Sequence, residues 1–281
     1  MSQEVTKIKK RISSISGALK VTSAMKLVST VKLKKWKNKM LANREYANKL
    51  FDTANTILSF AKKNKTPFNT PNENTDKNLY IIVSSTLGLC GSYNNNIFKL
   101  ADATIKKQDD AIILGNKGMI HYENGDFTKV EGFEEYSSIE NSSLINQLIS
   151  LITSEYLKGT YHEIHLIYSE YKNSMIFIPR DSLILPLQQV ETSNEGFGPI
   201  LEPDEKTLIE TLIPIYIKTI VFSKLLESEV CEQAARCNAM ENATNNAKDL
   251  LDELKIEFNK AWIPSTTRIS FSPRRSLFPL F

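Results

Sequence analysis

Long apolar runs are missing from this sequence of 281 residues. A helix that crosses a bilayer needs about 20 mostly apolar residues, and no window of the chain approaches that length. The chain opens MSQEVTKIKK, without the apolar stretch that follows the first basic residues of a secretory signal. We therefore expect a chain that is made and kept in the cytosol and that meets membranes only through partners.

Cysteine and histidine are also scarce. Three cysteines, Cys90, Cys231 and Cys237, are too few and too scattered for a disulfide framework or a zinc site. We expect them to be small buried or half-buried apolar residues. Two of the three histidines, His162 and His165, stand three apart on a predicted strand, which places them on opposite faces. No metal site is expected.

Glycine and proline are nearly absent from the two ends of the chain. Residues 2–60 contain one glycine and no proline, and residues 204–262 contain no glycine. Apolar residues recur in both stretches at the spacing of one helical face. They are Val5, Ile8, Ile12, Ile15 and Leu19 in the first, and Leu208, Leu212, Ile215, Phe222, Leu225, Leu226, Val230, Ala243, Ala247, Leu250, Leu254, Phe258 and Ala261 in the second. Each stretch predicts a helix of roughly 80 Å, and the two incomplete seams predict an antiparallel coiled coil.

The middle of the chain carries a different pattern. A stretch rich in Asn, Thr and Pro, residues 62–78, has little to bury and is typical of a linker. After it, short β-branched runs predict strands that are buried on both faces, with helices between them. The predicted strands are Leu79–Ser85, Ala111–Gly115 and His162–Tyr171, and the predicted helices are Asn94–Lys107 and Ser142–Tyr156. This alternation predicts an open α/β sheet of Rossmann-like type.

The predicted fold class is therefore α/β, with a long antiparallel coiled coil of N- and C-terminal helices and a central Rossmann-like α/β domain. Five segments follow from the patterns. They are the N-terminal coiled-coil helix (1–61), the linker (62–78), the α/β domain (79–203), the C-terminal coiled-coil helix (204–262) and an atypical tail (263–281).

Charge is distributed very unevenly along the chain. Residues 1–50 hold 13 Lys and Arg against two acids, a net charge of +11, whereas the remaining residues carry a net charge of −8. This asymmetry predicts an acidic partner surface or a polyanion near the first helix. The lysine-rich stretch Lys26–Lys39, which includes Trp36, leaves open a basic coiled-coil protein that binds nucleic acid.

A glycine turn, GLCGS at Gly88–Ser92, follows the first predicted strand. This is a place where a loop can cradle phosphate or present a nucleophile. A phosphate loop would need a lysine and a hydroxyl residue at the helix start, and Cys90 as a nucleophile would need a nearby base. We therefore expect the glycines of this turn, and those of GNKG at Gly115–Gly118, to serve tight turns and close packing. An enzyme with Cys90 as nucleophile is the third hypothesis.

Five motifs, in order, resemble the gamma subunit of F-type ATP synthases. They are Ile8–Lys35, Ser84–Phe98, Gly115–Gly118, Leu201–Pro203 and Glu227–Ala261. The resemblance implies a non-catalytic central shaft whose helices turn inside a ring of three alpha and three beta subunits. It also implies an α/β foot near the epsilon subunit and the membrane rotor ring (the c-ring), at the cytoplasmic face of the cell membrane. No catalytic residue and no cofactor is implied, and nucleic acid is not an expected partner.

By the same resemblance, five residues lie where the shaft meets the catalytic ring. They are Met25, Lys26, Glu232, Gln233 and Arg236. The alternative for Met25 is packing within the coiled coil. The shaft would favour a different conformation in each beta subunit as it turns, and so couple proton passage to ATP synthesis or hydrolysis.

The sequence departs from the family in two places. In the glycine turn, Thr86 and Leu87 stand where the family usually has Asp-Arg. After Ala261 the family continues as a helix, whereas this chain carries Pro264, Pro273 and Pro279, which predicts that the helix stops. Either the end of the chain is altered, for example by a frame shift, or the shaft is shortened and the tail has another role.

Overall fold

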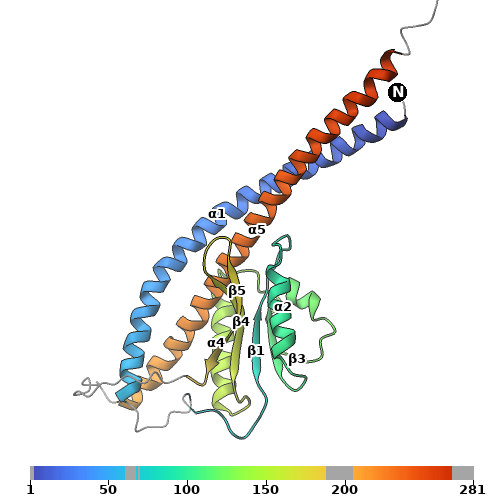
Figure 1. Ribbon diagram of the computed structural model, residues 1–281. Helices are drawn as coiled ribbons and strands as arrows, with labels where there is room; N and C mark the ends of the chain where they lie inside the picture. Colours follow the sequence, from blue (N-terminus) through green and yellow to red (C-terminus); the bar gives the residue numbers. More distant parts are fainter. Residues whose placement is uncertain (1–2, 61–67, 69, 188–204, 268–281) are drawn as a thin grey trace, which may run out of the picture. The chain divides into compact units, whose positions relative to one another are not determined.

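The computed structural model describes residues 3–60, 68, 70–187 and 205–267 (Figure 1). Two long helices flank shorter elements in the sequence. The elements are α1 (Gln3–Phe60), β1 (Leu79–Val83), α2 (Tyr93–Thr104), β2 (Asp110–Leu114), α3 (Asn116–His121), β3 (Thr128–Lys129), α4 (Ser142–Leu157), β4 (Ile164–Tyr171), β5 (Phe177–Leu185) and α5 (Glu205–Thr267). Among the described residues, no helix has both the length and the apolar content that a membrane crossing requires.

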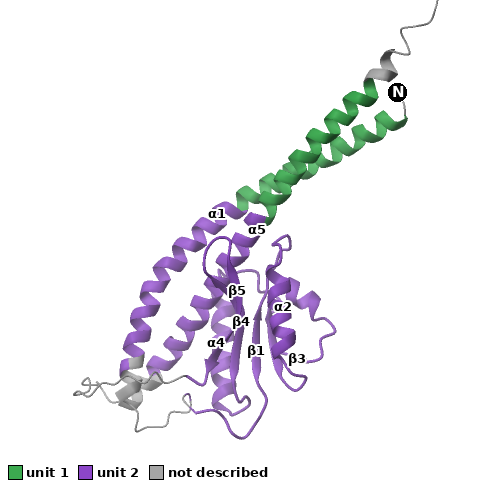
Figure 2. Ribbon diagram, viewed as in Figure 1, with its two compact units in different colours: residues 1–28, 239–281 green, residues 29–238 purple. Residues whose placement is uncertain are grey.

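The chain forms two compact units (Figure 2). Unit 1 consists of residues 1–28 and 239–281, and unit 2 consists of residues 29–238. Each of the long helices α1 and α5 contributes residues to both units. Unit 1 is thus built from the ends of the chain, and unit 2 holds the whole sheet.

The sheet of unit 2 has the strand order β3-β2-β1-β4-β5. Leu79 of β1 is in register with Asp110 of β2 and with Ile164 of β4, and both pairings are parallel. The predicted parallel β1-α2-β2 arrangement is confirmed. The β5 strand, which pairs with β4 in antiparallel fashion, was not predicted, because Pro179, Arg180 and Asp181 interrupt its apolar pattern. Proline and charged residues are typical of an edge strand.

Both faces of the sheet are covered. Side chains of β1 alternate between the two faces, so that Ile81 and Val83 join a core with α4, α5 and Trp36 of α1. Tyr80 and Ile82 join a second core with α2 and with Cys231 of α5. All five residues of β1 are buried, which explains why its sequence is a continuous apolar run rather than an alternating one.

In unit 2, α1 and α5 run antiparallel and are joined by two polar contacts. Asn43 Nδ2 donates to Ser223 Oγ at 2.7 Å, and Thr30 Oγ1 lies 3.3 Å from Cys237 Sγ. Leu225, Leu226 and Val230 of the predicted α5 stripe are buried, as expected, but before Leu225 the buried face differs from the predicted one. Ile215 is 43% exposed, and the buried apolar residues between Thr211 and Lys224 are Ile213, Ile217 and Val221.

In unit 1 the same two helices also run antiparallel. Thr244 Oγ1 donates to Thr22 Oγ1 at 3.0 Å, and Lys26 Nζ donates to Glu241 at 2.7 Å. Val5 and Ile8 of the predicted α1 seam are buried, and Ile12, Ile15 and Leu19 are half-buried. On α5 the prediction of Leu250 is wrong: it is 37% exposed, whereas Leu251 and Leu254 are buried. Steps of four and three from Ala247 reach Leu251 and Leu254, which keeps one face toward α1.

The described residues of the predicted linker, 68 and 70–78, pack in part against the α/β domain. Phe68 is 7% exposed and belongs to the core beneath α4. The backbone amide of Leu187 donates to the Phe68 carbonyl at 2.7 Å. Asn72 Nδ2 donates to the carbonyls of Tyr156 and Tyr161. The expectation that this stretch has almost nothing to bury is therefore wrong from Phe68 onward.

The end of α5 also differs from the prediction. The helix continues through Pro264 to Thr267, so the expectation that Pro264 stops it is wrong. A proline removes one N–H donor, and so close to a helix end few further hydrogen bonds depend on it. The remaining tail, residues 268–281 with Pro273 and Pro279, lies outside the described residues.

Candidate functional site at the junction of α5 with the sheet

Between Lys224 and Asn238, α5 is bonded to the end of the α/β layer in almost every turn. All partners lie in unit 2, on β4, on the β4–β5 hairpin or around the glycine turn. The contacts are Lys224 Nζ to Tyr168 Oη, the Tyr171 amide to Glu227, Ser228 Oγ with Tyr93 Oη, Cys231 Sγ to the Ser169 carbonyl, Arg236 to the carbonyls of Leu87 and Gly88, and Asn238 Nδ2 to the Ser174 carbonyl. This set fixes both the rotation and the height of α5 against the sheet.

Arg236 is the most buried of the charged residues in these contacts. Its side chain is only 5% exposed. Nη2 donates to the Leu87 carbonyl at 2.7 Å and to Glu232 at 2.6 Å, and Nε donates to the Gly88 carbonyl at 3.2 Å. A guanidinium without such partners would be very costly at this depth. The residue therefore joins the glycine turn to α5 and also pairs with a carboxylate of its own helix.

The glycine turn is held in an unusual backbone conformation. Leu89 has a φ of 63° and Gly91 has a φ of 58°, both in the left-handed region. Leu89 is also 60% exposed, so burial of its side chain does not explain the strained backbone. Thr86 Oγ1 donates to the Ser137 carbonyl at 3.1 Å. A carboxylate at this position could not donate in that way, so the departure from the family's Asp-Arg pair brings a different contact, and Leu87 is left 59% exposed.

Cys90 does not have the surroundings of a nucleophile. It is 2% exposed, and its Sγ lies near Ser85 Oγ and the Asn94 amide. Burial raises the pKa of the Cys90 thiol, so the reactive thiolate is disfavoured. No histidine is close: His121 stacks on Phe98, and the other two bond to Asn72 and to carboxylates far along the sheet. Among the described residues no histidine bonds to Cys90, so the contacts of this thiol give the enzyme hypothesis no support.

The second glycine motif serves packing, as predicted. Gly115 has a φ of 98°, and a Cβ there would lie 2.2 Å from the Ser84 carbonyl oxygen. A Cβ on Gly118 would lie 2.6 Å from Ser84 Oγ. Instead, the Gly118 amide donates to Ser84 Oγ at 2.8 Å, and that hydroxyl donates to the Leu114 carbonyl. Both glycines allow α3 to begin directly against β1.

The structure divides the five predicted contact residues into two groups. Met25 and Lys26 belong to unit 1, are partly exposed, and Lys26 forms an ion pair with Glu241. Glu232, Gln233 and Arg236 belong to unit 2 and are 9%, 3% and 4% exposed. Gln233 Nε2 donates to Glu229 Oε1 at 3.1 Å. The second group thus lies inside the chain, beneath the glycine turn.

Sequence reasoning missed Glu229, which belongs to the same group. It lies three residues before Glu232 and seven before Arg236, which puts all three on one face of α5. Burial, and then the nearby Glu229 charge, raise the pKa of Glu232 to about 7, although Arg236 opposes this. Burial also raises the pKa of Glu229. The helical spacing of the two acids and the arginine was the signal that could have revealed the group.

Trp36 is not available to stack on a nucleic-acid base. It is 4% exposed and is part of the core between α1 and the sheet. Lys35 and Lys39 place their ammonium groups 5.0 and 4.7 Å from its ring centroid. The aromatic residue on which the nucleic-acid hypothesis depended therefore serves packing.

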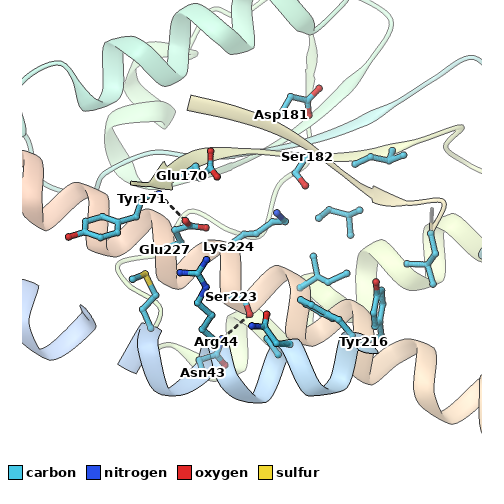
Figure 3. A pocket seen from close by; sticks show the side chains of 18 of the residues that line it. Asn43, Arg44, Glu170, Tyr171, Asp181, Ser182, Tyr216, Ser223, Lys224 and Glu227 are labelled. Carbon is cyan, nitrogen blue, oxygen red and sulfur yellow. Dashed lines mark hydrogen bonds between the residues drawn. The ribbon is translucent and has the colours of Figure 1, made fainter. Parts of the chain in front are cut away.

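A cavity of about 680 Å³ lies among α1, α5 and β5 (Figure 3). Figure 3 shows Arg44 of α1 extending toward Glu227 of α5, and Lys224 beside them. Burial lowers the pKa of Lys224 and raises the pKa of Glu227. Glu170, at the same wall, is bonded to Lys172 and Arg180. Glu170 thus meets two cations, and no group of three metal-binding side chains occurs in the described part of the chain.

Comparison with known proteins gives concordant matches along the chain. A family model described as ATP synthase matches residues 4–262. The chain is 35% identical over 266 residues to the ATP synthase gamma chain of Mycoplasma mobile, covering 91% of this chain and 92% of that protein. It is 31% identical over 270 residues to the ATP synthase gamma chain of Mesoplasma florum, covering 94% of each.

Solved structures share the fold. A chain in the OSCP/F1/c-ring of Euglena gracilis mitochondrial ATP synthase aligns with a TM-score of 0.60 at 18% identity, covering 98% of this chain and 99% of that chain. A chain in the central stalk and c-ring of Tetrahymena thermophila mitochondrial ATP synthase aligns with a TM-score of 0.54 at 22% identity, covering 79% and 99%.

Proposed function

Because the chain belongs to the gamma subunits of ATP synthase, the non-catalytic central-stalk subunits, we propose that it turns as a shaft inside a ring of three alpha and three beta subunits. In this role it couples proton passage through the membrane sector to ATP synthesis or hydrolysis. The observation that carries the proposal is the bonded junction between α5 and the sheet. Torque that enters the α/β domain needs a stiff connection to a long helix, and the contacts from Lys224 to Asn238 supply one.

The junction is markedly unequal between the two long helices. α5 contributes buried partners such as Ser228, Cys231 and Arg236, whereas Lys35 of α1 meets Glu140 of the α/β layer in an exposed ion pair. Exposed ion pairs contribute little, about 0–1 kcal/mol. In the proposed mechanism α5 therefore carries the torque, and α1 mainly presents its basic face to the acidic surface of the catalytic ring.

The five contact residues take two different roles in this proposal. Met25 and Lys26, which are partly exposed, touch the catalytic ring directly. Glu232, Gln233 and Arg236 are buried, so they act by holding the glycine turn, whose exposed Leu87 and Leu89 reach the ring. The foot of the α/β domain meets the epsilon subunit and the c-ring. Membrane association is then indirect, at the cytoplasmic face of the cell membrane.

The proposal is tested by isolating the tagged full chain from gently solubilised native membranes and identifying its companions by mass spectrometry. We expect two different P-loop ATPase subunits at three copies each per shaft.

Disulfide cross-linking then locates the contacts: Met25→Cys and Leu87→Cys should link to a beta subunit carrying an introduced cysteine, whereas Lys158→Cys, exposed on the far end of α4, should not. Recovery of nucleic acid without ATPase subunits would contradict the proposal.

A further inference from the structure

The cavity among α1, α5 and β5 has no role in the proposed shaft function (Figure 3). All of its lining residues belong to unit 2. Its volume of about 680 Å³ lies within the range of small-molecule sites, about 300–1,000 Å³. Two cations face it from the helical side, Arg44 of α1 and Lys224 of α5. Each stands next to a member of the hydrogen-bonded pair that joins the two helices, Asn43 with Ser223.

Within the described part of the chain, neither cation forms an ion pair with a carboxylate. Lys224 Nζ donates to the Tyr168 hydroxyl at 3.2 Å and lies 4.7 Å from the centroid of that ring. Both of these contacts are neutral, and burial lowers the pKa of Lys224. Arg44 extends toward Glu227 (Figure 3) but forms no ion pair with it. The planar fork of Arg44 therefore keeps its N–H donors for a ligand or for water.

The carboxylates on the cavity wall do not cancel these two positive charges. Glu170 is paired with two cations of the β4–β5 hairpin, so that group carries a net charge of +1. Asp181 lies 2.9 Å from His165, and Glu163, the other partner of that histidine, does not line the cavity. Glu227 alone faces the two helical cations. With a neutral histidine, the groups on the wall and their cationic partners sum to +1, which favours an anionic ligand.

The neutral groups of the cavity suit an oxyanion with an organic part. Asn43 Nδ2 donates to Ser223 Oγ at 2.7 Å, and no described residue accepts the proton of that serine, so its hydroxyl can donate to a ligand. The rings of Phe51 and Tyr216 line the same cavity, with their centroids 5.2 Å apart. They offer an apolar surface beside the cationic one.

We propose that this cavity binds a small organic phosphate, whose phosphate group is held by Arg44, Lys224 and the Ser223 hydroxyl. The organic part lies toward the rings of Phe51 and Tyr216. A phosphate monoester presents three strong acceptor oxygens and close to two negative charges, which matches one guanidinium fork, one ammonium and one hydroxyl. A carboxylate offers only two oxygens and one charge. Because α1, α5 and β5 all line the cavity, a bound ligand also braces α1 against the α/β domain.

Calorimetric titration of the full chain with phenyl phosphate at low ionic strength tests the site. We expect saturable binding of one molecule per chain. Arg44→Gln removes the fork and should weaken binding about tenfold or more. Since Arg44 is exposed, this variant should fold as the wild type does. Lys49→Gln removes an exposed cation of the same helix that does not line the cavity, and it should leave the affinity unchanged.

A second variant should act in the opposite direction. Glu227→Gln removes the carboxylate that faces the two cations, so binding of phenyl phosphate should become about threefold tighter or more. The glutamine oxygen can still accept the hydrogen bond that the Tyr171 amide donates to Glu227 at 2.9 Å, so the wall keeps its shape. Weaker binding in Glu227→Gln would contradict the placement of the phosphate group beside this residue.

Three further results would overturn the proposal. They are an absence of saturable binding of phenyl phosphate, an undiminished affinity in Arg44→Gln, and equal responses to Arg44→Gln and Lys49→Gln. Benzoate that binds as tightly as phenyl phosphate would refute the assignment to phosphate, and inorganic phosphate that binds as tightly would refute the organic part. The titration needs no partner subunit, so it can fail while the proposed shaft function stands, and the reverse also holds.

Discussion

The Tyr93 hydroxyl lies 2.7 Å from the Ser228 hydroxyl, and neither residue is more than 1% exposed. Tyr93 begins α2, and Ser228 lies on α5. Burial raises the pKa of Tyr93 well above its usual range, so the phenol keeps its proton and can donate it. The Ser169 amide of β4 donates to the same serine oxygen at 3.5 Å. This hydroxyl pair is thus the meeting point of two helices and the sheet.

Removal of the Ser228 hydroxyl alone should lower the free energy of unfolding more than removal of both hydroxyls. Ser228→Ala leaves the buried Tyr93 hydroxyl only its long contact with the backbone carbonyl of residue 228, at 3.4 Å, which should lower the free energy of unfolding by about 1–3 kcal/mol. Tyr93→Phe combined with Ser228→Ala should recover about 1 kcal/mol of that loss. Urea denaturation of the single and double variants measures the coupling. Tyr171→Phe, whose hydroxyl bonds the exposed Ser174, is the control and should change stability by less than about 0.5 kcal/mol. Strictly additive losses would refute the coupling.

Loss of Arg236 should be far more damaging than loss of an exposed cation. Arg236→Met leaves Glu232 buried without its guanidinium and two carbonyls without donors, so we expect about 3–5 kcal/mol of destabilisation. Lys26→Met breaks the exposed ion pair with Glu241 and should cost at most about 1 kcal/mol. Denaturation curves of the two variants provide the comparison. Similar costs for both would mean that the burial of Arg236 adds nothing to stability.

The periodic spacing of apolar residues was sufficient to predict the long helices, but not to predict which of their residues are buried. The start of α1 and its seam from Val5 to Leu19 follow from local spacing alone. Leu250 and Ile215 were misplaced because the buried face of α5 is set by what packs against it, which spacing within one helix does not contain. The edge strand β5 was missed for a related reason: only its pairing with β4 makes a segment with Pro179 and two charges extended.

The candidate site was predicted only in part. The family resemblance identified Glu232, Gln233 and Arg236, but their burial beneath the glycine turn depends on a contact between residues almost 150 positions apart in the chain, Arg236 and Leu87. No local pattern specifies such a pairing. Glu229 could have been found from its spacing, whereas the role of Thr86 as a donor to a carbonyl could not, because its partner lies in a loop without regular structure.

His165 should stabilise the pairing of β4 with β5 more at acidic pH than at basic pH. Nδ1 lies 2.9 Å from Asp181 and Nε2 lies 2.9 Å from Glu163, so both ring nitrogens meet carboxylates. Burial alone would lower the pKa of His165, but the hydrogen bonds and charges of Asp181 and Glu163 outweigh it and the pKa is raised. The stabilisation is therefore present below the unfolded value of about 6.5 and is lost as the pH rises through the folded pKa.

The variant His165→Gln tests this dependence. We expect the stability difference between the wild type and His165→Gln to be on the order of 1 kcal/mol at pH 5 and to shrink by pH 9. Denaturation at several pH values measures the difference, which cancels pH effects that arise elsewhere in the chain. His121→Gln, whose ring stacks on Phe98 and has no carboxylate partner among the contacts described, is the control variant. A constant difference for His165→Gln would remove the carboxylate pair as the cause.

Leu89 should be replaceable with a gain in stability, because its backbone is strained and its side chain contributes little packing. A left-handed conformation costs a leucine roughly 1–2 kcal/mol, whereas asparagine adopts it more readily. Leu89 has a φ of 63° and is 60% exposed, so Leu89→Asn should raise the free energy of unfolding by about 0.5–1 kcal/mol. Leu87→Asn, at 59% exposure but without a positive φ, is the matched control and should give no gain in stability.

If Leu89 is kept for contact with the catalytic ring, Leu89→Asn should lower coupled ATP synthesis in the assembled complex while the isolated chain becomes more stable. A loss of stability in Leu89→Asn would show that the turn is not strained at this residue.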